Sequence, residues 1–290
     1  MVNQINYLGN STKRIFNQKV QMSKPSHKRV VIGKIISKAQ LSPEHFQIGF
    51  LCPYIANNIA PGQFIQIRLS RQLNDPLLCR PFAVYRIADD IIYILFKIVG
   101  KGTRFLSEKA IGDELEITGP LGNGFPINDD TETILLIAGG MGVAALYMLA
   151  KKLAHRKVIA ILGACSLDRL LGVDDLLSLG VDVFIATDDG SCGYKGMVSE
   201  LFEEVISKEN YILSSCRIYS CGPIPMLKAV AQIANEYKIP AYVSLEAKMA
   251  CGIGACMGCA CEVASSDGST QYKMVCNDGP IFNDQEILWK

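Results

Sequence analysis

The sequence predicts a multidomain β + α/β fold with an antiparallel β-barrel, a parallel three-layer α/β domain and a small C-terminal cysteine segment. Three observations lead to this prediction. Short β-branched segments alternate with turn residues in the first third, and apolar runs alternate with helical patterns in the middle. Four cysteines then fall between Cys251 and Cys261. We expect a basic arm over residues 1–28, the barrel over 29–128, the α/β domain over 129–240 and the cysteine segment over 241–290.

Composition excludes several classes of protein. With 290 residues, 49% hydrophobic and 20% charged, the chain is globular and long enough for several domains. The net charge of +1 gives no electrostatic footprint for nucleic acid. The apolar stretch from Ile134 to Leu149 is too short for a membrane span. Because 11 cysteines occur without a secretory signal, we expect a soluble cytoplasmic protein with no membrane or nucleic-acid partner.

The N-terminal arm carries Lys13, Arg14, Lys19 and Lys24 and contains no acidic residue before His27. This composition is typical of a disordered tail or of an organellar transit peptide. We favour the tail because the arm has few arginines and no amphipathic helix.

The barrel is predicted from six strand candidates whose alternation and length fit half-buried strands. The candidates are Val30–Ser37, His45–Cys52, Gln63–Leu69, Phe82–Ile87, Ile91–Val99 and Glu114–Thr118. A turn cluster from Gly119 to Gly124 marks the end of the domain.

Two features inside the barrel are candidates for phosphate binding. Arg80 precedes Pro81 at the start of a strand, and a second strand runs through Lys97 into Gly100-Lys-Gly102-Thr103, where we expect a helix to start at Thr103. Arginines and helix N-termini both bind phosphate. Each feature alone is more often a surface charge or an ordinary turn and cap, so the prediction depends on their occurring together.

The middle third changes to an α/β pattern. The buried strand Thr133–Ala138 is followed by Gly139-Gly140-Met-Gly142 and by a helix over Val143–Leu153. This strand, glycine turn and helix are typical of a dinucleotide site, although Gly-Gly-x-Gly lacks the full fingerprint. The further elements expected are strand Lys157–Gly163, helix Asp168–Leu179, strand Asp182–Thr187, helix Met197–Ile206, strand Arg217–Ser220 and helix Ile224–Glu236.

The binding crevice is expected where the parallel strands end. Those ends are Gly139–Gly142, Gly163–Ser166, Asp188–Ser191 and Tyr219–Pro223. Cys221 lies at one of these ends, before Gly222 and Pro223. A cysteine at the end of a strand is more often an inert packing residue than a functional one. For Asp188 and Asp189 the alternative to a functional role is that they only cap a turn.

The C-terminal segment follows a short linker strand, Ala241–Leu245, and holds Cys251, Cys256, Cys259 and Cys276 with the spacing C-x4-C-x2-C-x16-C. The first three have the plant-type spacing of a [2Fe–2S] cluster. Structural zinc, a disulfide framework and buried unligated cysteines are the alternatives, and the glycine-rich x4 gap favours the cluster. Cys261 is interpreted as a bystander because its side chain should point away from that of Cys259.

In their order, these features resemble the ferredoxin–NADP reductase superfamily, in which the barrel binds a flavin and the second domain a pyridine nucleotide. With the stretch from Glu246 to Cys259 and with Val275-Cys276-Asn-Asp-Gly-Pro, the chain is similar to one family, the electron-transfer subunits of dihydroorotate dehydrogenase B. The resemblance covers about Arg29 to Phe282.

The resemblance implies site residues. FAD would be held by Arg80, Pro81, Phe82, Ala83, Leu95, Phe96, Lys97, Gly102 and Thr103. NAD would be held by Gly139, Gly140, Gly142, Gly222 and Pro223, with Cys221 near the nicotinamide. Family members commonly have serine where this chain has Ala83, so a hydroxyl bond to the flavin ring is missing.

The resemblance also implies an activity in de novo pyrimidine (UMP) biosynthesis. Electrons would pass from the FMN of a separate dihydroorotate-oxidising subunit through the [2Fe–2S] cluster and FAD to NAD+, in a heterotetramer of two plus two subunits. One alternative is the same module in another complex, of the hydrogenase, sulfite reductase or NADH–ferredoxin type. A redox sensor would need no nucleotide domain, and a zinc-stapled adaptor would be colourless.

Overall fold

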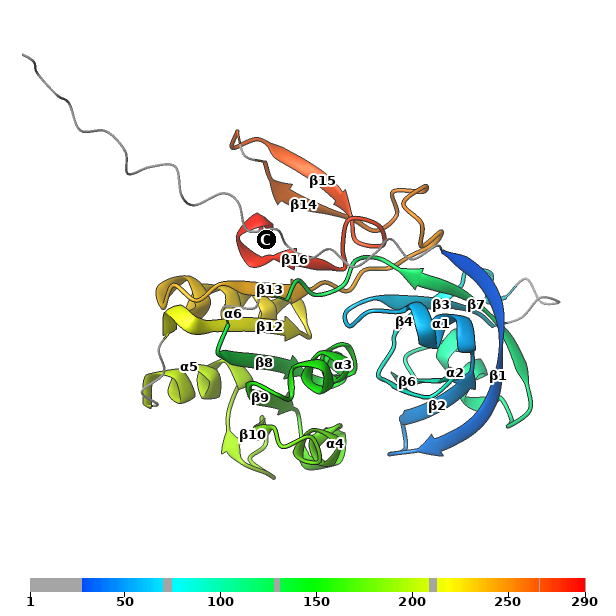
Figure 1. Cartoon of the computed structure of the whole chain (residues 1–290), viewed down its shortest axis with the longest axis horizontal. Coiled ribbons are helices and arrows are strands. Elements are labelled where there is room, and N and C mark those ends of the chain that lie inside the picture. The colour runs from blue at the N-terminus through cyan, green and yellow to red at the C-terminus, as the bar shows by residue number, and fades with distance from the viewer. Residues whose placement is uncertain (1–27, 70–74, 128–130, 209–212, 266, 290) are drawn as a thin grey trace, which may run out of the picture.

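The computed structural model describes residues 28–69, 75–127, 131–208, 213–265 and 267–289. Two seven-stranded sheets and a separate two-stranded hairpin make up its β-structure. Figure 1 shows the first sheet curving beside the layered α/β part, with the hairpin standing away from both. The prediction of a disordered arm falls almost wholly on residues that lie outside this description.

The first sheet is entirely antiparallel and has the strand order β4-β3-β7-β1-β2-β6-β5. Its strands are β1 (Arg29–Gln40), β2 (His45–Leu51), β3 (Phe64–Arg68), β4 (Arg80–Ala83), β5 (Arg86–Ala88), β6 (Ile91–Lys97) and β7 (Glu114–Leu121). Because β4 and β5 are the two ends of this order, the sheet is a half-barrel. The predicted fold class is confirmed in this form.

Three details of the half-barrel differ from the sequence prediction. The single strand expected over Phe82–Ile87 is divided into β4 and β5, which lie at opposite edges of the sheet. Helix α1 (Pro53–Asn58) was not predicted. Helix α2 (Lys101–Glu108) starts two residues before Thr103, whose hydroxyl accepts the backbone N–H of Val99 at 2.9 Å. The predicted start at Thr103 is therefore wrong, since this side chain shapes the preceding turn from inside the helix.

The second sheet has the order β11-β10-β9-β8-β12-β13-β16, parallel except for its last strand. Its strands are β8 (Thr133–Gly139), β9 (Lys157–Ala164), β10 (Asp182–Thr187), β11 (Tyr194–Lys195), β12 (Cys216–Cys221), β13 (Ala241–Ser244) and β16 (Ile281–Asn283). Helices α3 (Val143–Leu153) and α4 (Val173–Leu177) share a core with one face. Helices α5 (Val198–Lys208) and α6 (Ile224–Glu236) share a core with the other. The predicted three layers are confirmed.

Two predictions in this domain need correction. The long helix expected over Asp168–Leu179 is a single 3-10 turn, Leu167–Arg169, followed by the short α4. Gly172, with φ of +76°, separates them because a left-handed residue interrupts a helix. Strand β13, expected as a linker, instead pairs with β12 inside the sheet, and β16 extends the sheet from the C-terminal segment.

The C-terminal segment adds the hairpin of β14 (Ala260–Ala264) and β15 (Thr270–Met274) and packs into a core shared by all three parts of the chain. Phe64 and Leu121 come from the half-barrel, Leu227 and Val243 from the α/β domain, and Cys276 from the segment. The segment is thus stabilised by burial against both domains.

No helix among the described residues is long and apolar enough to cross a membrane.

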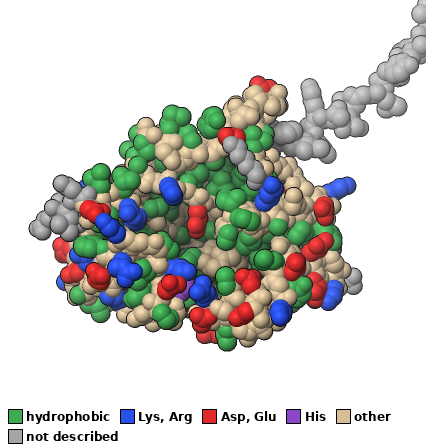
Figure 2. All heavy atoms as spheres, turned by 180° about the vertical axis from the view of Figure 1, so that it is seen from behind, with side chains coloured by type: hydrophobic (Ala, Val, Ile, Leu, Met, Phe, Trp, Pro, Cys, Tyr) green, Lys and Arg blue, Asp and Glu red, His purple; other side chains and the backbone are tan. Residues whose placement is uncertain are grey.

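Figure 2 shows the face opposite that of Figure 1. Basic and acidic side chains are interspersed over it, and hydrophobic side chains gather around a hollow near its middle. This mixture agrees with the net charge of +1.

Candidate functional site

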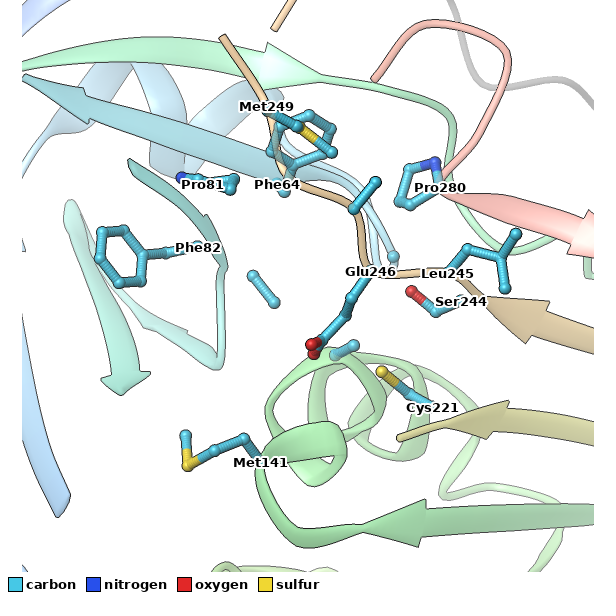
Figure 3. Close-up of a pocket in the computed structure, with 14 residues that line it drawn as sticks. Phe64, Pro81, Phe82, Met141, Cys221, Ser244, Leu245, Glu246, Met249 and Pro280 are labelled. Atoms are coloured by element: carbon cyan, nitrogen blue, oxygen red, sulfur yellow. The ribbon is translucent and has the colours of Figure 1, made fainter. Parts of the chain in front are cut away.

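A cavity of about 200 Å³ lies where the half-barrel, the α/β domain and the C-terminal segment meet. It is lined by Gly62, Phe64, Pro81, Phe82, Ala83, Met141, Ala145, Cys221, Ser244, Leu245, Glu246, Ala247, Met249 and Pro280. Three residues of the predicted flavin motif, Pro81, Phe82 and Ala83, thus line the same cavity as Cys221, which was predicted to lie near the nicotinamide. Figure 3 shows these side chains around the opening.

The predicted phosphate-binding features also meet in space. A Cβ atom on Gly102 would lie 2.6 Å from Nε of Arg80, so the guanidinium group packs directly against the first turn of α2. The same guanidinium donates a hydrogen bond of 2.7 Å to the carbonyl of Leu78. A cation beside free helix N–H groups suits a pyrophosphate. Arg80 and the backbone around Gly102 therefore fit a phosphate group, whereas the hydroxyl of Thr103 is already bonded to the backbone of Val99 and Gly100.

The aromatic residues of the flavin motif lie in the core. The ring of Phe82 meets that of Phe96 edge-on with centroids 5.9 Å apart, and Phe96 stacks on Phe46 at 5.7 Å. Figure 3 shows the Phe82 ring turned away from Glu246 and Cys221. Phe82 and Phe96 can thus reach a flavin only through their backbones. Leu95 is buried in the core shared with the α/β domain, and Lys97 pairs with Glu44 at 3.2 Å.

Most glycines of the predicted nucleotide site are required by protein packing. A Cβ on Gly142 would lie 1.9 Å from the carbonyl oxygen of Cys221, and one on Gly139 would lie 2.6 Å from the sulfur of Met226. Gly222 is equally close to Met226. Gly140, with φ of +53°, is different because nothing lies within 4 Å of its Cβ position. Gly142 thus brings the start of α3 against the end of β12, whereas Gly140 faces open space.

Cys221 ends β12 at the cavity wall and is 3% exposed. Burial raises the pKa of its thiol to about 12, the nearby Glu246 carboxylate adds to the effect, and a hydrogen bond with Ser244 opposes it. The thiol is therefore neutral at physiological pH. It can pack against a bound ring but is not a nucleophile or a base.

Glu246 is a cavity residue that we did not assign a function from the sequence. Its carboxylate projects into the opening, toward Cys221 and Met141 (Figure 3). The side chain is solvent-accessible through the open cavity, yet the dense walls around it raise the pKa of its carboxyl group by burial. In a concave site, a carboxylate can be accessible to solvent and still be surrounded by protein atoms. A ring bound above Glu246 would exclude the remaining water. The available sequence signal was an acidic residue two positions after the last parallel strand, β13.

The four predicted cluster cysteines lie in one loop system rich in N–H···S hydrogen bonds. Gly254 donates to Sγ of Cys276 at 3.1 Å, and Ala255 donates to Sγ of Cys251 at 3.3 Å. Further backbone donors reach Cys251, Cys256 and Cys259 at 3.4 Å. Such donors stabilise thiolates, and they are typical of iron–sulfur sites. The donor set thus fits an iron–sulfur cluster.

The cysteines form two pairs. The side chain of Cys251 lies beside that of Cys256, and the side chain of Cys276 beside that of Cys259. Backbone N–H groups, led by that of Ile253, lower the pKa of Cys251 to about 6, while burial and then Cys259 raise the pKa of Cys276 to about 12. Within the described ranges, no three Cys, His, Asp or Glu side chains close around a single metal ion.

Cys261 lies outside both pairs. It belongs to β14, and its thiol contacts the carbonyl of Lys273 at 3.4 Å.

Comparison with known proteins identifies the C-terminal segment. Residues 246–288 match the family described as the iron–sulfur cluster binding domain of dihydroorotate dehydrogenase B. The chain is 35% identical over 90% of its length to the dihydroorotate dehydrogenase B (NAD(+)) electron transfer subunit of Desulforamulus reducens, covering 99% of that protein. It is 39% identical over 89% of its length to the subunit with the same name from Caldanaerobacter subterraneus, covering 98% of it.

Solved structures show the same fold. A chain of the NADH-dependent reduced ferredoxin–NADP oxidoreductase, studied for flavin-based electron bifurcation, superposes with a TM-score of 0.79 at 31% identity, covering 89% of this chain and 90% of that one. The ferredoxin reductase in carbazole 1,9a-dioxygenase superposes with a TM-score of 0.62 at 20% identity, covering 73% and 67%, and shows the fold alone. The chain therefore belongs to the family of dihydroorotate dehydrogenase B electron transfer subunits, with a ferredoxin–NADP reductase-like fold and a C-terminal iron–sulfur binding domain.

Proposed function

We propose that this chain carries electrons between a dihydroorotate-oxidising partner and NAD+ through a [2Fe–2S] cluster and FAD, in pyrimidine biosynthesis. One observation carries the proposal above all. Glu246, Ala247 and Met249 line the cavity, and Cys251 follows Met249 by two residues. The site that fits a flavin and the loop that fits a cluster are thus joined by one short segment.

The [2Fe–2S] type is supported by the arrangement of its ligands. Cys251, Cys256, Cys259 and Cys276 would together supply four thiolates, the number that a [2Fe–2S] cluster takes. Each pair also receives backbone N–H donors, which stabilise negative charge on the sulfurs. A mononuclear zinc site would need all four thiolates on one ion.

The residues around the cavity suit hydride exchange with a nicotinamide. Bound there, a flavin exchanges single electrons with a cluster and a hydride with a nicotinamide. Arg80 and the start of α2 would hold its pyrophosphate, and the β4 backbone would lie along its ring. Cys221 and Glu246 would border the nicotinamide, and Gly140 would leave space for the dinucleotide. NAD is favoured over NADP by the names of the two relatives, which specify NAD(+), and by the absence of a basic residue in Gly163–Ser166.

The partner surface is proposed at the loop from Cys251 to Cys259, called the cluster loop below. Membership in the family implies a catalytic partner subunit. Ile253 and Met257, which flank Cys256, have exposed fractions of 50% and 62%, so apolar side chains surround the outermost cysteine. Apolar surface of this kind marks protein interaction sites. We place an FMN-containing dihydroorotate dehydrogenase subunit here, in an assembly of two plus two chains.

The division into 29–128, 129–240 and 241–290 is proposed as a functional one, for flavin, nucleotide and cluster. Strands β13 and β16, which belong to the last range, nevertheless complete the nucleotide sheet.

The decisive experiment is purification of the native complex, with absorption spectroscopy, iron and flavin analysis, and mass spectrometry of the proteins that come along. We expect flavin and two irons per chain, together with an FMN-containing dihydroorotate oxidase. A colourless protein would support the zinc adaptor. A pigmented protein unable to oxidise NADH with an artificial acceptor would support the redox sensor.

A second candidate function is supported by one structural comparison. The bifurcating oxidoreductase chain is 31% identical over 89% of this chain, so the same module in an NADH–ferredoxin type complex is the alternative. Recovery of such a partner in place of a dihydroorotate oxidase would establish it.

A further inference from the structure

Gln66 is a buried polar side chain that the sequence did not single out. It lies on β3 with only 2% of its surface exposed, and its Nε2 donates a long hydrogen bond of 3.4 Å to the carbonyl of Ala250. A Cβ atom on Gly252 would lie 2.5 Å from both the amide carbon and the amide oxygen of Gln66. The amide thus contacts the residues immediately before and after Cys251.

The shape of the cluster loop matches this side chain. Gly252 has φ of +70°, a conformation that glycine adopts without a steric penalty. The absence of a Cβ lets its backbone lie against the Gln66 amide. Because the hydrogen bond to Ala250 is long, close packing contributes most to the fit.

The strand that carries Gln66 is also part of the proposed flavin site. Gln66 is in register with Pro81 of β4, and Pro81 lines the cavity. Its neighbours Ile65 and Ile67 point into the half-barrel core, which leaves Gln66 on the outer face, under the cluster loop. A single side chain therefore connects the strand pair at the flavin with the backbone of a proposed iron ligand.

We propose that Gln66 is a positioning residue that fixes Cys251, and with it the cluster, relative to the flavin. The inference rests on the proposed function. It adds that electron exchange between flavin and cluster depends on this amide, whereas flavin binding and hydride exchange with NADH do not. Electron transfer rates fall steeply with distance and with loss of a packed medium, so a loosened loop slows this one step.

The test compares Gln66→Met and Gln66→Asn with the wild type in the holo-complex. After mixing with NADH, stopped-flow absorbance follows reduction of the flavin and then of the cluster. We expect unchanged flavin reduction and unchanged iron content, with cluster reduction slowed about tenfold, as for other residues that orient metal ligands. Hydrogen exchange at residues 250–256 should increase, and the electron paramagnetic resonance signal of the reduced cluster should shift.

Gln63 provides the matched control. It directly precedes β3 and is also buried, but its amide accepts the N–H of Ala60 and donates to the carbonyl of Gly122, and neither bond involves the cluster loop. Gln63→Met should lower the melting temperature while leaving the rate of cluster reduction unchanged.

Unaltered cluster reduction, hydrogen exchange and resonance signal in both Gln66 variants would overturn the inference. Gln66→Asn keeps an amide, so the test remains open if Gln66→Met fails to fold. Absence of iron or flavin from the wild-type complex would instead contradict the proposed function. The two failures are thus distinguishable.

Discussion

The two cysteine pairs of the proposed cluster site differ in their exposure to solvent. Cys259 and Cys276 are 4% and 0% exposed and belong to the core that joins the half-barrel, the α/β domain and the C-terminal segment. Cys256 is exposed and Cys251 half-buried, and both are held mainly by N–H groups of their own loop. The inner pair is thus part of the packing of the whole protein, whereas the outer pair depends on a local turn.

The difference in burial suggests that the outer and the inner cysteines have different roles in the proposed site. Burial raises the pKa of Cys276, and local N–H donors lower that of Cys251. The outer pair borders the exposed side chains of Ile253 and Met257, so under the proposed function electrons entering from a partner would reach this side first. The inner pair would anchor the cluster to both domains.

The largest effect expected is loss of the cluster. Replacing a cysteine of either pair should cause this loss, but the two replacements should differ in their effect on protein stability. Cys256→Ser and Cys276→Ser should both lose iron, measured by metal analysis. Cys256→Ser should retain flavin and be the more stable of the two variants because its hydroxyl remains in water. Cys276→Ser buries a hydroxyl in the shared core, which costs roughly 1–3 kcal/mol of unfolding free energy. Wild-type iron in either variant, or equal melting temperatures, would contradict this account.

A difference in thiol reactivity should follow in the cluster-free protein. After iron removal, iodoacetamide at pH 7 should modify Cys251 and Cys256 at least about tenfold faster than Cys259 and Cys276, because the inner thiols are buried and the reagent cannot reach them. Mass spectrometry of peptides gives the four rates. Denatured protein is the control, in which all four should react alike. Equal rates in the folded protein would mean that the inner pair is not sequestered.

The buried side of the segment also predicts a pH dependence. Burial raises the pKa of Asp284, which follows β16 and is 3% exposed, to about 6. Between about pH 4 and 6 the folded protein binds this proton more tightly than the unfolded chain, so stability falls as pH rises through 6. A shift of this size corresponds to about 3 kcal/mol.

Asp284→Asn should abolish that fall and stabilise the protein at pH 8. Denaturant unfolding at pH 5 and pH 8 measures the effect, with Asp267→Asn at the exposed hairpin turn as control. Parallel pH profiles for Asp284→Asn and wild type would show that this side chain is not desolvated.

Local patterns predicted the elements of this fold well. Val143–Leu153, Asp182–Thr187 and Ile224–Glu236 have the predicted boundaries because each carries a complete periodic pattern and clear end signals. The break between β4 and β5 arises where sheet pairing overrides a continuous local pattern, since the two strands lie at opposite edges of the sheet. The short α4 instead has a local cause, the left-handed backbone of Gly172.

The site was predictable where spacing carries the chemistry and not where distant residues meet. The spacing of Cys251, Cys256, Cys259 and Cys276 indicates a cluster by itself. Gln66 and Ala250 are 184 positions apart, and no local signal pairs them. The glycines around Gly142 have a motif-like spacing, yet the structure explains them by the approach of Cys221 and Met226.

The smallest effect on stability is expected at the exposed rim of the outer pair. Ile253→Ser and Met257→Asn should change the unfolding free energy by less than about 0.5 kcal/mol, since both side chains lie at the surface. Asparagine suits position 257, where Met257 has φ of +55°, because it tolerates left-handed backbone. Iron and flavin content should be unchanged. Binding of the catalytic subunit should weaken by about tenfold or more, because truncating central apolar contacts costs over 1 kcal/mol.

Titration of the partner by light scattering or calorimetry measures this loss, with Tyr272→Ser as the matched control. Tyr272 is 61% exposed, similar to Met257, but lies on the β14–β15 hairpin, which Figure 1 shows projecting away from both domains. Equal weakening by all three variants would mean that the partner covers the hairpin as well. No weakening by the two loop variants would place the partner elsewhere, and the outer pair would then be exposed for another reason than electron entry.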